Sequence, residues 1–292
     1  MEKIKIMSDT ACDIPKEIAV ALGIELLPIP ITIDGKGYLE GEDFTYEEFY
    51  EILLQSKELP FTSHITAPAF TEKFIRAYKE GYNRIICTTI NSKGSSMFEA
   101  AIIAKELFYG EYPEAKDKVK IAVLDSKTYS MAYGLPLMIA ADKLKNGANY
   151  DELVEYLIDA YNRVEVYFTV FTLDFAKRSG RISAAAALVG GMLGLRPIMT
   201  FMNGDNKVVS KVRGDKQAVA ELANIAAERY IVPKSPYVVL VGDDKQAGEP
   251  LVEAMTKQMG YPPIGVYFIG SCVAINAGPK VVGQVFLGES RL

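Results

Sequence analysis

Two hydroxyl-bearing segments of this chain contain the residue types that bind a negatively charged group. They are the pair Thr62-Ser63 and the turn from Ser92 to Ser96. Hydroxyl groups donate hydrogen bonds to a carboxylate or a phosphate while they stay uncharged, so they can lie at the mouth of an apolar cavity at a small desolvation cost. We therefore take four residues as candidates for binding an anion: Thr62, Ser63, Ser95 and Ser96. A capping role stays open for them, because Ser and Thr are also common helix N-caps.

The elements around the second segment are those that would position such a site. An apolar run, Arg84 to Ile90, precedes the turn, and a helical pattern follows it to about Tyr109. A strand, a turn and a helix in this order point backbone N–H groups and the positive end of the helix toward a ligand beyond the sheet. The turn has no obvious base, so we expect it to bind an anion rather than to act on one.

An enzyme that uses Ser95 is the alternative, either a hydrolase or a phosphotransferase. A hydrolase needs a base beside its nucleophile, and His64 is the only histidine in the chain. The G-x-S-x-G turn that exposes a catalytic serine is absent from the sequence. We therefore interpret His64 as a surface or turn residue and expect no catalytic residues.

Carboxylates follow two of the expected strands. Asp9 and Asp13 come after the first, and Asp125 comes after a later one. Such side chains can bind Mg²⁺, but they more often cap helices, and Pro15 suits the first helical turn after an Asp13 N-cap. We favour capping, and we expect no metal and no cofactor.

The composition excludes several classes of protein. A net charge of −5 offers no broad positive field for nucleic acid. Three widely spaced cysteines indicate reduced core residues and a cytoplasmic location, not disulfides or a zinc site. The N-terminus has no apolar signal-peptide core, and the most apolar run, Ile182 to Leu195, is shorter than the roughly 20 residues of a membrane span and contains glycines. We expect no integral membrane segment.

The order of the expected elements changes near residue 163. Before it, helical patterns alternate with four expected strands, Ile4–Met7, Ile24–Ile33, Arg84–Thr89 and Lys120–Leu124. This alternation predicts βαβ units and a mainly parallel sheet. After it the strands lie closer together, at Val164–Leu173, Lys207–Val212, Tyr237–Val241, Ile264–Ile269 and Val281–Leu287.

The pattern predicts a two-domain α/β protein. Residues 1–163 would form an N-terminal α/β/α domain with a mainly parallel sheet, and residues 164–292 a C-terminal α/β domain with a mixed or antiparallel sheet. The turn Asn203-Gly204-Asp205-Asn206 indicates a hairpin in the second, because Asn and Gly tolerate positive φ. The run Ser183 to Leu195 has almost no polar side chains; it can pack in the core or line an alkyl chain, through Leu188, Met192 and Leu193.

An ordered set of short motifs resembles the DegV family, the fatty-acid-binding proteins that include the FakB subunits of bacterial fatty acid kinase. The likeness runs nearly end to end, and its motifs are Ser8-Asp9-Thr10, Thr62-Ser63, Ile90-Asn91-Ser92-Lys93-Gly94-Ser95, Val123-Leu124-Asp125-Ser126, Ser179-Gly180-Arg181-Ile182-Ser183, Arg196-Pro197-Ile198 and Asn276-Ala277-Gly278-Pro279.

The resemblance implies a long-chain fatty acid between the two domains, with its carboxyl group bound by Thr62 and Ser95 and bordered by Asn276. It implies a FakA-like, ATP-dependent fatty acid kinase as partner, which phosphorylates the bound acid to an acyl phosphate, with Arg181 and Arg213 as contacts to the kinase or the phosphate. A lipid-binding regulator without a kinase is a further alternative.

Several positions differ from the family pattern. Thr62-Ser63-His64-Ile65-Thr66 stands where the family usually reads TSxPS, and Ser95-Ser96-Met97 stands where it reads SGT. Asn276 stands where the family usually has histidine, and Lys280 replaces the last glycine of the motif that follows. Asparagine can donate a hydrogen bond but cannot carry a proton, and the lysine adds a positive charge nearby.

Overall fold

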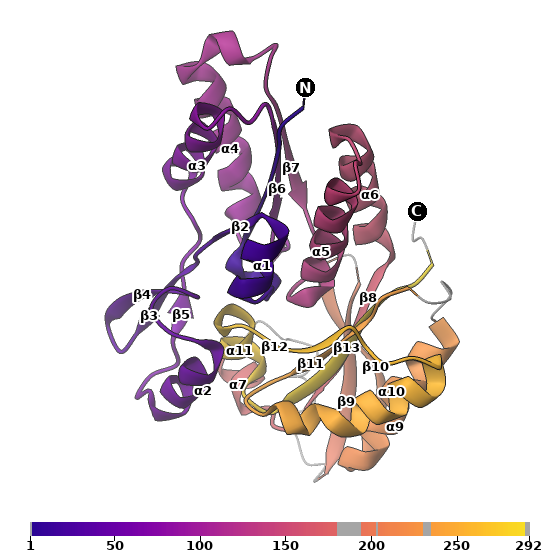
Figure 1. Cartoon of the computed structure of the whole chain (residues 1–292). Helices are drawn as coiled ribbons and strands as arrows, with labels where there is room; N and C mark the ends of the chain where they lie inside the picture. The colour runs from indigo at the N-terminus through magenta and orange to yellow at the C-terminus, as the bar shows by residue number, and fades with distance from the viewer. Residues whose placement is uncertain (1, 180–193, 203, 230–234, 290–292) are drawn as a thin grey trace.

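The computed structural model describes residues 2–179, 194–202, 204–229 and 235–289, which form two lobes (Figure 1). The first lobe contains a parallel four-stranded sheet in the order β2-β1-β6-β7. Its strands are β1 (Ile4–Asp9), β2 (Ile24–Leu27), β6 (Arg84–Thr89) and β7 (Lys120–Asp125). Its main helices are α1 (Lys16–Leu22), α3 (Ala67–Lys79), α4 (Met97–Glu111), α5 (Met131–Lys145) and α6 (Tyr150–Arg163).

Helices cover both faces of the parallel sheet. The pair α3 and α4 lies on one side, and α1, α5 and α6 lie on the other (Figure 1). In α6 the buried Leu153, Leu157 and Tyr161 recur every four residues, as the helical period requires, and Asn149 and Glu152 form a capping box at its start. The predicted βαβ architecture of this region is confirmed.

A small antiparallel sheet extends from the first lobe. It has the order β4-β3-β5, and its elements are β3 (Pro30–Ile33), β4 (Lys36–Leu39), α2 (Tyr46–Gln55) and β5 (Phe61–Thr62). The single strand expected over Ile24–Ile33 is wrong, because β2 ends before Pro28 and the chain enters a different sheet at β3. Proline cannot donate a ladder hydrogen bond, so it interrupts the strand.

The second lobe is built on a mixed six-stranded sheet in the order β10-β9-β8-β13-β11-β12, in which only β11 and β12 are parallel. Its strands are β8 (Val164–Val170), β9 (Leu195–Met202), β10 (Asp205–Arg213), β11 (Val238–Val241), β12 (Gly265–Phe268) and β13 (Val281–Leu287). Its helices are α7 (Asp174–Ser179), α9 (Asp215–Arg229), α10 (Glu249–Met259) and α11 (Ser271–Ala277).

Three single-turn 3₁₀ helices complete the described elements: η1 (Thr10–Cys12), η2 (Pro113–Ala115) and η3 (Lys245–Gly248). The hairpin expected near Gly204 is confirmed, since β9 and β10 are antiparallel and Met202 pairs with Asp205. The six-stranded sheet begins at β8, directly after α6, and both neighbours of β8 pair with it antiparallel. A domain boundary between residues 163 and 164 stays a prediction.

The two lobes meet along several elements. Helix α5 contacts β8, β11 and β13, while α11 contacts α2, β5 and η1. The Tyr50 hydroxyl, in α2, donates to the carbonyl of Ile269 at 2.8 Å, just before α11. Figure 1 shows α11 and α7 on the side of the second sheet that faces the first lobe, with α9 and α10 on the other side. Among the described residues, no helix combines the length and apolarity needed to span a membrane.

Candidate functional site

In the turn between β6 and α4, the first five backbone N–H groups all donate hydrogen bonds to other groups of the protein. The N–H groups of Ile90 to Gly94 donate, in chain order, to Asp9 Oδ2 (2.8 Å), Thr128 O (3.1 Å), Asp125 Oδ1 (3.0 Å), Asn91 Oδ1 (3.2 Å) and Asn91 O (3.0 Å). The next two N–H groups, of Ser95 and Ser96, have no acceptor within the part of the chain that the structure describes. They lie at the start of α4, where the helix dipole favours negative charge.

The hydroxyls of Ser95 and Ser96 contribute little to capping helix α4. Ser96 occupies the N-cap position of α4, but its side chain makes no capping hydrogen bond. Within the described residues, the hydroxyl of Ser95 accepts only a long hydrogen bond, 3.4 Å, from the N–H of Met97. Ser95 is half-buried and Ser96 is exposed. The geometry therefore leaves two backbone donors and two hydroxyls available to an anion.

Asp9 supports the turn from beneath. It is fully buried and accepts hydrogen bonds from the N–H groups of Ile90 and Ala11 and from the hydroxyl of Tyr133, the last at 2.7 Å. Loss of water around its carboxyl group raises the pKa of Asp9 to about 6, against the opposing effect of these hydrogen bonds. The predicted capping role is confirmed for Asp9, which caps η1.

The predicted N-cap role of Asp13 is wrong. Asp13 ends η1 in a left-handed conformation, with φ of 56°, and α1 begins only after Pro15. Its side chain instead accepts a hydrogen bond from the hydroxyl of Ser130, and burial raises the pKa of Asp13 well above its usual value. Within the described residues, no group of three or more His, Cys, Asp or Glu side chains is arranged to hold a metal ion.

Asp125 acts as a second support for the turn. Its carboxylate accepts from the backbone N–H of Ser92 at 3.0 Å and from the Ser92 hydroxyl at 2.6 Å. It also accepts from the N–H of Lys127 at 2.9 Å, beyond the end of β7. The carboxylates of Asp9 and Asp125, the last residues of β1 and β7, thus hold the Ser95 turn from both neighbouring strands.

Thr62 lies at a different place, on the small sheet. It pairs with Ile31 across β5 and β3, and β5 contacts helix α11 of the second lobe. Ser63 is held next to it, since its N–H donates to the carbonyl of Pro30 at 2.9 Å. Both hydroxyl residues and His64 are exposed.

Asn276 lies in the same helix, α11. Its amide donates to the carbonyl of Cys272 at 2.9 Å, one helical turn earlier, and its side chain is half-buried. Gly278 ends the helix with φ of +82°, and a Cβ there would come within 2.8 Å of the Phe175 ring. The structure thus places Asn276 in α11, the helix that the Thr62 strand contacts. In the described chain no hydrogen bond joins Thr62, Asn276 or His64 to Ser95.

Glu40 is a functional candidate that the sequence analysis missed. It is fully buried, and its carboxylate accepts from the Thr10 hydroxyl at 2.6 Å, the Ser271 hydroxyl at 2.8 Å and the backbone N–H of Cys272 at 3.0 Å. It therefore provides the N-terminal cap that Gly270 cannot give to α11. Glu40 and Ser271 are 231 residues apart, so no local pattern identifies the pair.

Of the remaining predicted residues, one lies within the described chain and four lie outside it. Arg213 is exposed at the end of β10. Four predicted residues lie outside the described residues: Arg181, Leu188, Met192 and Leu193. The predicted acyl tunnel and the Arg181 docking role therefore stay predictions.

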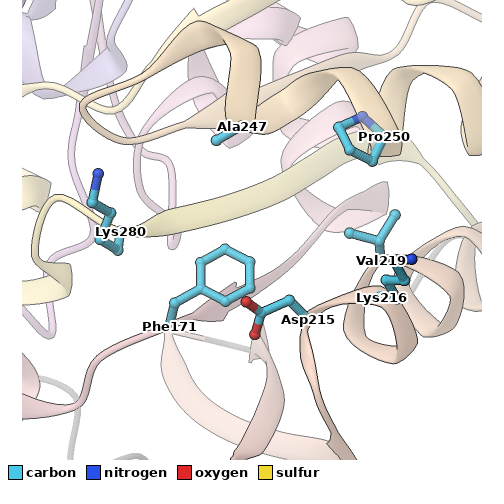
Figure 2. A pocket seen from close by; sticks show the side chains of 7 residues that line it. All are labelled: Phe171, Asp215, Lys216, Val219, Ala247, Pro250 and Lys280. Atoms are coloured by element: carbon cyan, nitrogen blue, oxygen red, sulfur yellow. The ribbon is translucent and has the colours of Figure 1, made fainter.

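A pocket of about 580 Å³ opens in the second lobe between the end of β8, α9 and the η3–α10 segment. Figure 2 shows the side chains that line it: Phe171, Asp215, Lys216, Val219, Ala247, Pro250 and Lys280. The Arg196 guanidinium lies 5.6 Å from the Phe171 ring centroid and pairs with Asp215 at 2.7 Å, while Lys280 pairs with Asp243 at 2.8 Å. None of the predicted carboxyl-binding residues lines this pocket.

Comparison with known proteins gives a consistent result along the whole chain. The family model described as "Uncharacterised protein, DegV family" matches residues 3–289. A DegV domain-containing protein of Caldanaerobacter subterraneus is 30% identical over 287 residues, covering 98% of this chain and 99% of the relative.

Solved structures match equally fully. A DegV family protein of Thermus thermophilus, described by its fatty acid binding, is 25% identical, with a TM-score of 0.86 over 98% of this chain and all of that one. A fatty acid binding DegV family protein of Streptococcus agalactiae is also 25% identical, with a TM-score of 0.85 over 99% of this chain and all of that one.

Proposed function

Because this chain belongs to the DegV family, we propose that it is a fatty-acid-binding protein that encloses a long-chain fatty acid between its lobes and holds the carboxyl group at the Ser95 turn. The observation that carries the proposal is the pair of N–H groups at Ser95 and Ser96, which lack an acceptor in the described chain at the start of a 15-residue helix. Solved relatives that are described as binding fatty acids support the choice of ligand.

The carboxyl group and the alkyl chain have different roles in this proposal. Burying a chain of roughly sixteen carbons at about 0.8 kcal/mol per CH₂ yields on the order of 10 kcal/mol before the ordering cost. A few hydrogen bonds to the carboxyl group add about 1 to 3 kcal/mol each. Affinity thus comes mainly from the alkyl chain, while the donors of the Ser95 turn, with Thr62 and Asn276, fix the orientation of the acid.

We further propose that the protein presents its bound acid to an ATP-dependent fatty acid kinase and carries no catalytic residues of its own. The resemblance to FakB subunits supports this role, and the exposed Arg213 gives a positive group for contact with the kinase or the transferred phosphate. A cytoplasmic location fits three cysteines that are all buried and unpaired in disulfides.

The decisive experiment is to denature the purified protein, extract it with organic solvent and identify the released lipid by mass spectrometry. We expect a long-chain fatty acid close to one per chain. A protein that is recovered empty and fails to bind added palmitate would contradict the proposal, and cleavage of acyl esters by the empty protein would favour the hydrolase alternative. Adding a fatty acid kinase and ATP to the loaded protein then tests for acyl phosphate.

A further inference from the structure

Asn91 uses every polar atom of its side chain to join three parts of the molecule. The residue is 1% exposed. Its Nδ2 donates to the carbonyl of Gly204 at 2.9 Å and to the hydroxyl of Tyr129 at 2.7 Å, and its Oδ1 accepts from the N–H of Lys93 at 3.2 Å. A buried side chain with these partners holds a single rotamer, because any rotation breaks several bonds without water to replace them.

The contact at Gly204 comes from the opposite lobe. Gly204 lies in the turn between β9 and β10, with φ of +82°, and a Cβ there would come within 2.8 Å of Asn91 Oδ1. The ring of Phe201, at the end of β9, packs on Tyr129 with centroids 4.4 Å apart. The close approach therefore needs glycine both for its backbone conformation and for space.

An exposed ion pair lies beside the buried contact. Lys93 and Asp205 pair at 2.8 Å, but their side chains are 54% and 62% exposed. Exposed pairs of this kind contribute little, because water screens them and ordering two long side chains costs entropy. The specific link between the Ser95 turn and the β9–β10 hairpin is thus the hydrogen bond from Asn91.

Asn91 also shapes the turn that carries the available donors. Its carbonyl oxygen accepts from the N–H of Gly94 at 3.0 Å, while its side chain holds Lys93. Gly94 itself packs tightly against Tyr129, since a Cβ there would come within 2.4 Å of the Tyr129 hydroxyl. A shift of Asn91 therefore moves the backbone immediately before Ser95.

We propose that Asn91 is a positioning residue: through Gly204 it couples the packing of the second lobe to the position of the Ser95 and Ser96 donors. This inference rests on the proposed binding of a fatty acid carboxyl group at that turn. The coupling means that the carboxyl group is held well only while the β9–β10 hairpin is docked against Asn91.

The test compares two ligands with the same alkyl chain, palmitic acid and hexadecan-1-ol, so that their affinity ratio measures the preference for a carboxyl group. Two uncharged variants break the contact from its two sides, Asn91→Leu and Gly204→Ala. Gly35→Ala is the matched control for Gly204→Ala, because Gly35 has φ of +80° with nothing within 4 Å of its Cβ position. Ser95→Ala marks the loss expected when a donor of the turn is removed.

We expect Asn91→Leu and Gly204→Ala each to lower the preference for palmitic acid about tenfold, as Ser95→Ala does, while the affinity for hexadecan-1-ol stays within about twofold. Gly35→Ala is expected to keep the wild-type ratio. A general loss of stability would weaken both ligands alike, and that result would overturn the positioning role. Loss of the preference in Asn91→Leu alone would overturn the coupling to the second lobe.

A different result would refute the proposed function instead. If the wild-type protein bound neither ligand, or if it bound palmitic acid no more tightly than hexadecan-1-ol, the carboxyl group would not lie at this turn and Asn91 would have nothing to position. Because Gly204→Ala changes the β9–β10 hairpin and not the core of the first lobe, it keeps the test open if Asn91→Leu folds poorly.

Discussion

The buried carboxylate of Glu40 should contribute strongly to stability, and its replacement separates hydrogen bonding from packing. In Glu40→Ala three donors lose their acceptor: the hydroxyls of Thr10 and Ser271 and the N–H of Cys272. An unsatisfied buried donor costs roughly 1 to 3 kcal/mol. Partial reorientation of the two hydroxyls reduces the sum, so we expect a loss of about 3 to 5 kcal/mol in the free energy of unfolding.

Glu40→Gln should be much milder, because its amide oxygen keeps the two bonds to α11. Only the Thr10 side changes: its hydroxyl now faces an NH₂ group and loses its acceptor, at a cost of about 1 kcal/mol. The matched control is Glu42→Ala, an exposed carboxylate two residues away. Guanidinium unfolding followed by circular dichroism measures all three variants.

The same variants test whether α11 matters for the site. Since the Thr62 strand β5 contacts α11 and Asn276 bonds to Cys272 within that helix, release of the start of α11 should also lower palmitate affinity in Glu40→Ala, with little change in Glu40→Gln. If Glu40→Ala were as stable as Glu40→Gln, the three hydrogen bonds would not hold the helix, and the cap assigned to Glu40 would be wrong.

Three further outcomes follow from named contacts. Since burial raises the pKa of Asp9 from 3.8 to about 6, stability from its neutral form is complete below the lower value and is lost as pH rises through the higher one. Relative to Asp9→Asn, wild-type unfolding free energy should therefore fall by about 2 kcal/mol between pH 4 and pH 7 in urea titrations, and a rise would contradict this. Gly278→Ala should lower the melting temperature more than Gly260→Ala, because both have positive φ but only Gly278 faces the Phe175 ring; equal losses would show that the ring moves aside. Ser95→Ala should weaken palmitate binding about tenfold, measured by isothermal titration, without lowering the melting temperature; an unchanged affinity would remove Ser95 from the site.

The order of strands and helices was readable from the sequence because it depends on neighbours in the chain. The four-residue spacing of Leu153 and Leu157 indicated α6, and the valine-rich strand β13 was predicted with its observed bounds. The Ser95 turn was also found this way, since a strand, a polar turn and a helix follow each other within about 25 residues. The break between β2 and β3 was not predicted, because apolar residues continue on both sides of Pro28.

The contacts that join the lobes were decided only by the tertiary structure. Glu40 and Ser271 are 231 residues apart, and Asn91 and Gly204 are 113 apart. The first pair consists of two ordinary polar residues, and the second of a polar residue and a glycine. The local sequence shows the period of a helix or strand and the residue types of a turn. The partner of a buried polar group depends instead on which groups the fold brings close to it. For this protein the sequence by itself therefore determined the elements and the turn that offers donors to an anion, whereas folding decided which distant side chains hold that turn and helix α11 in place.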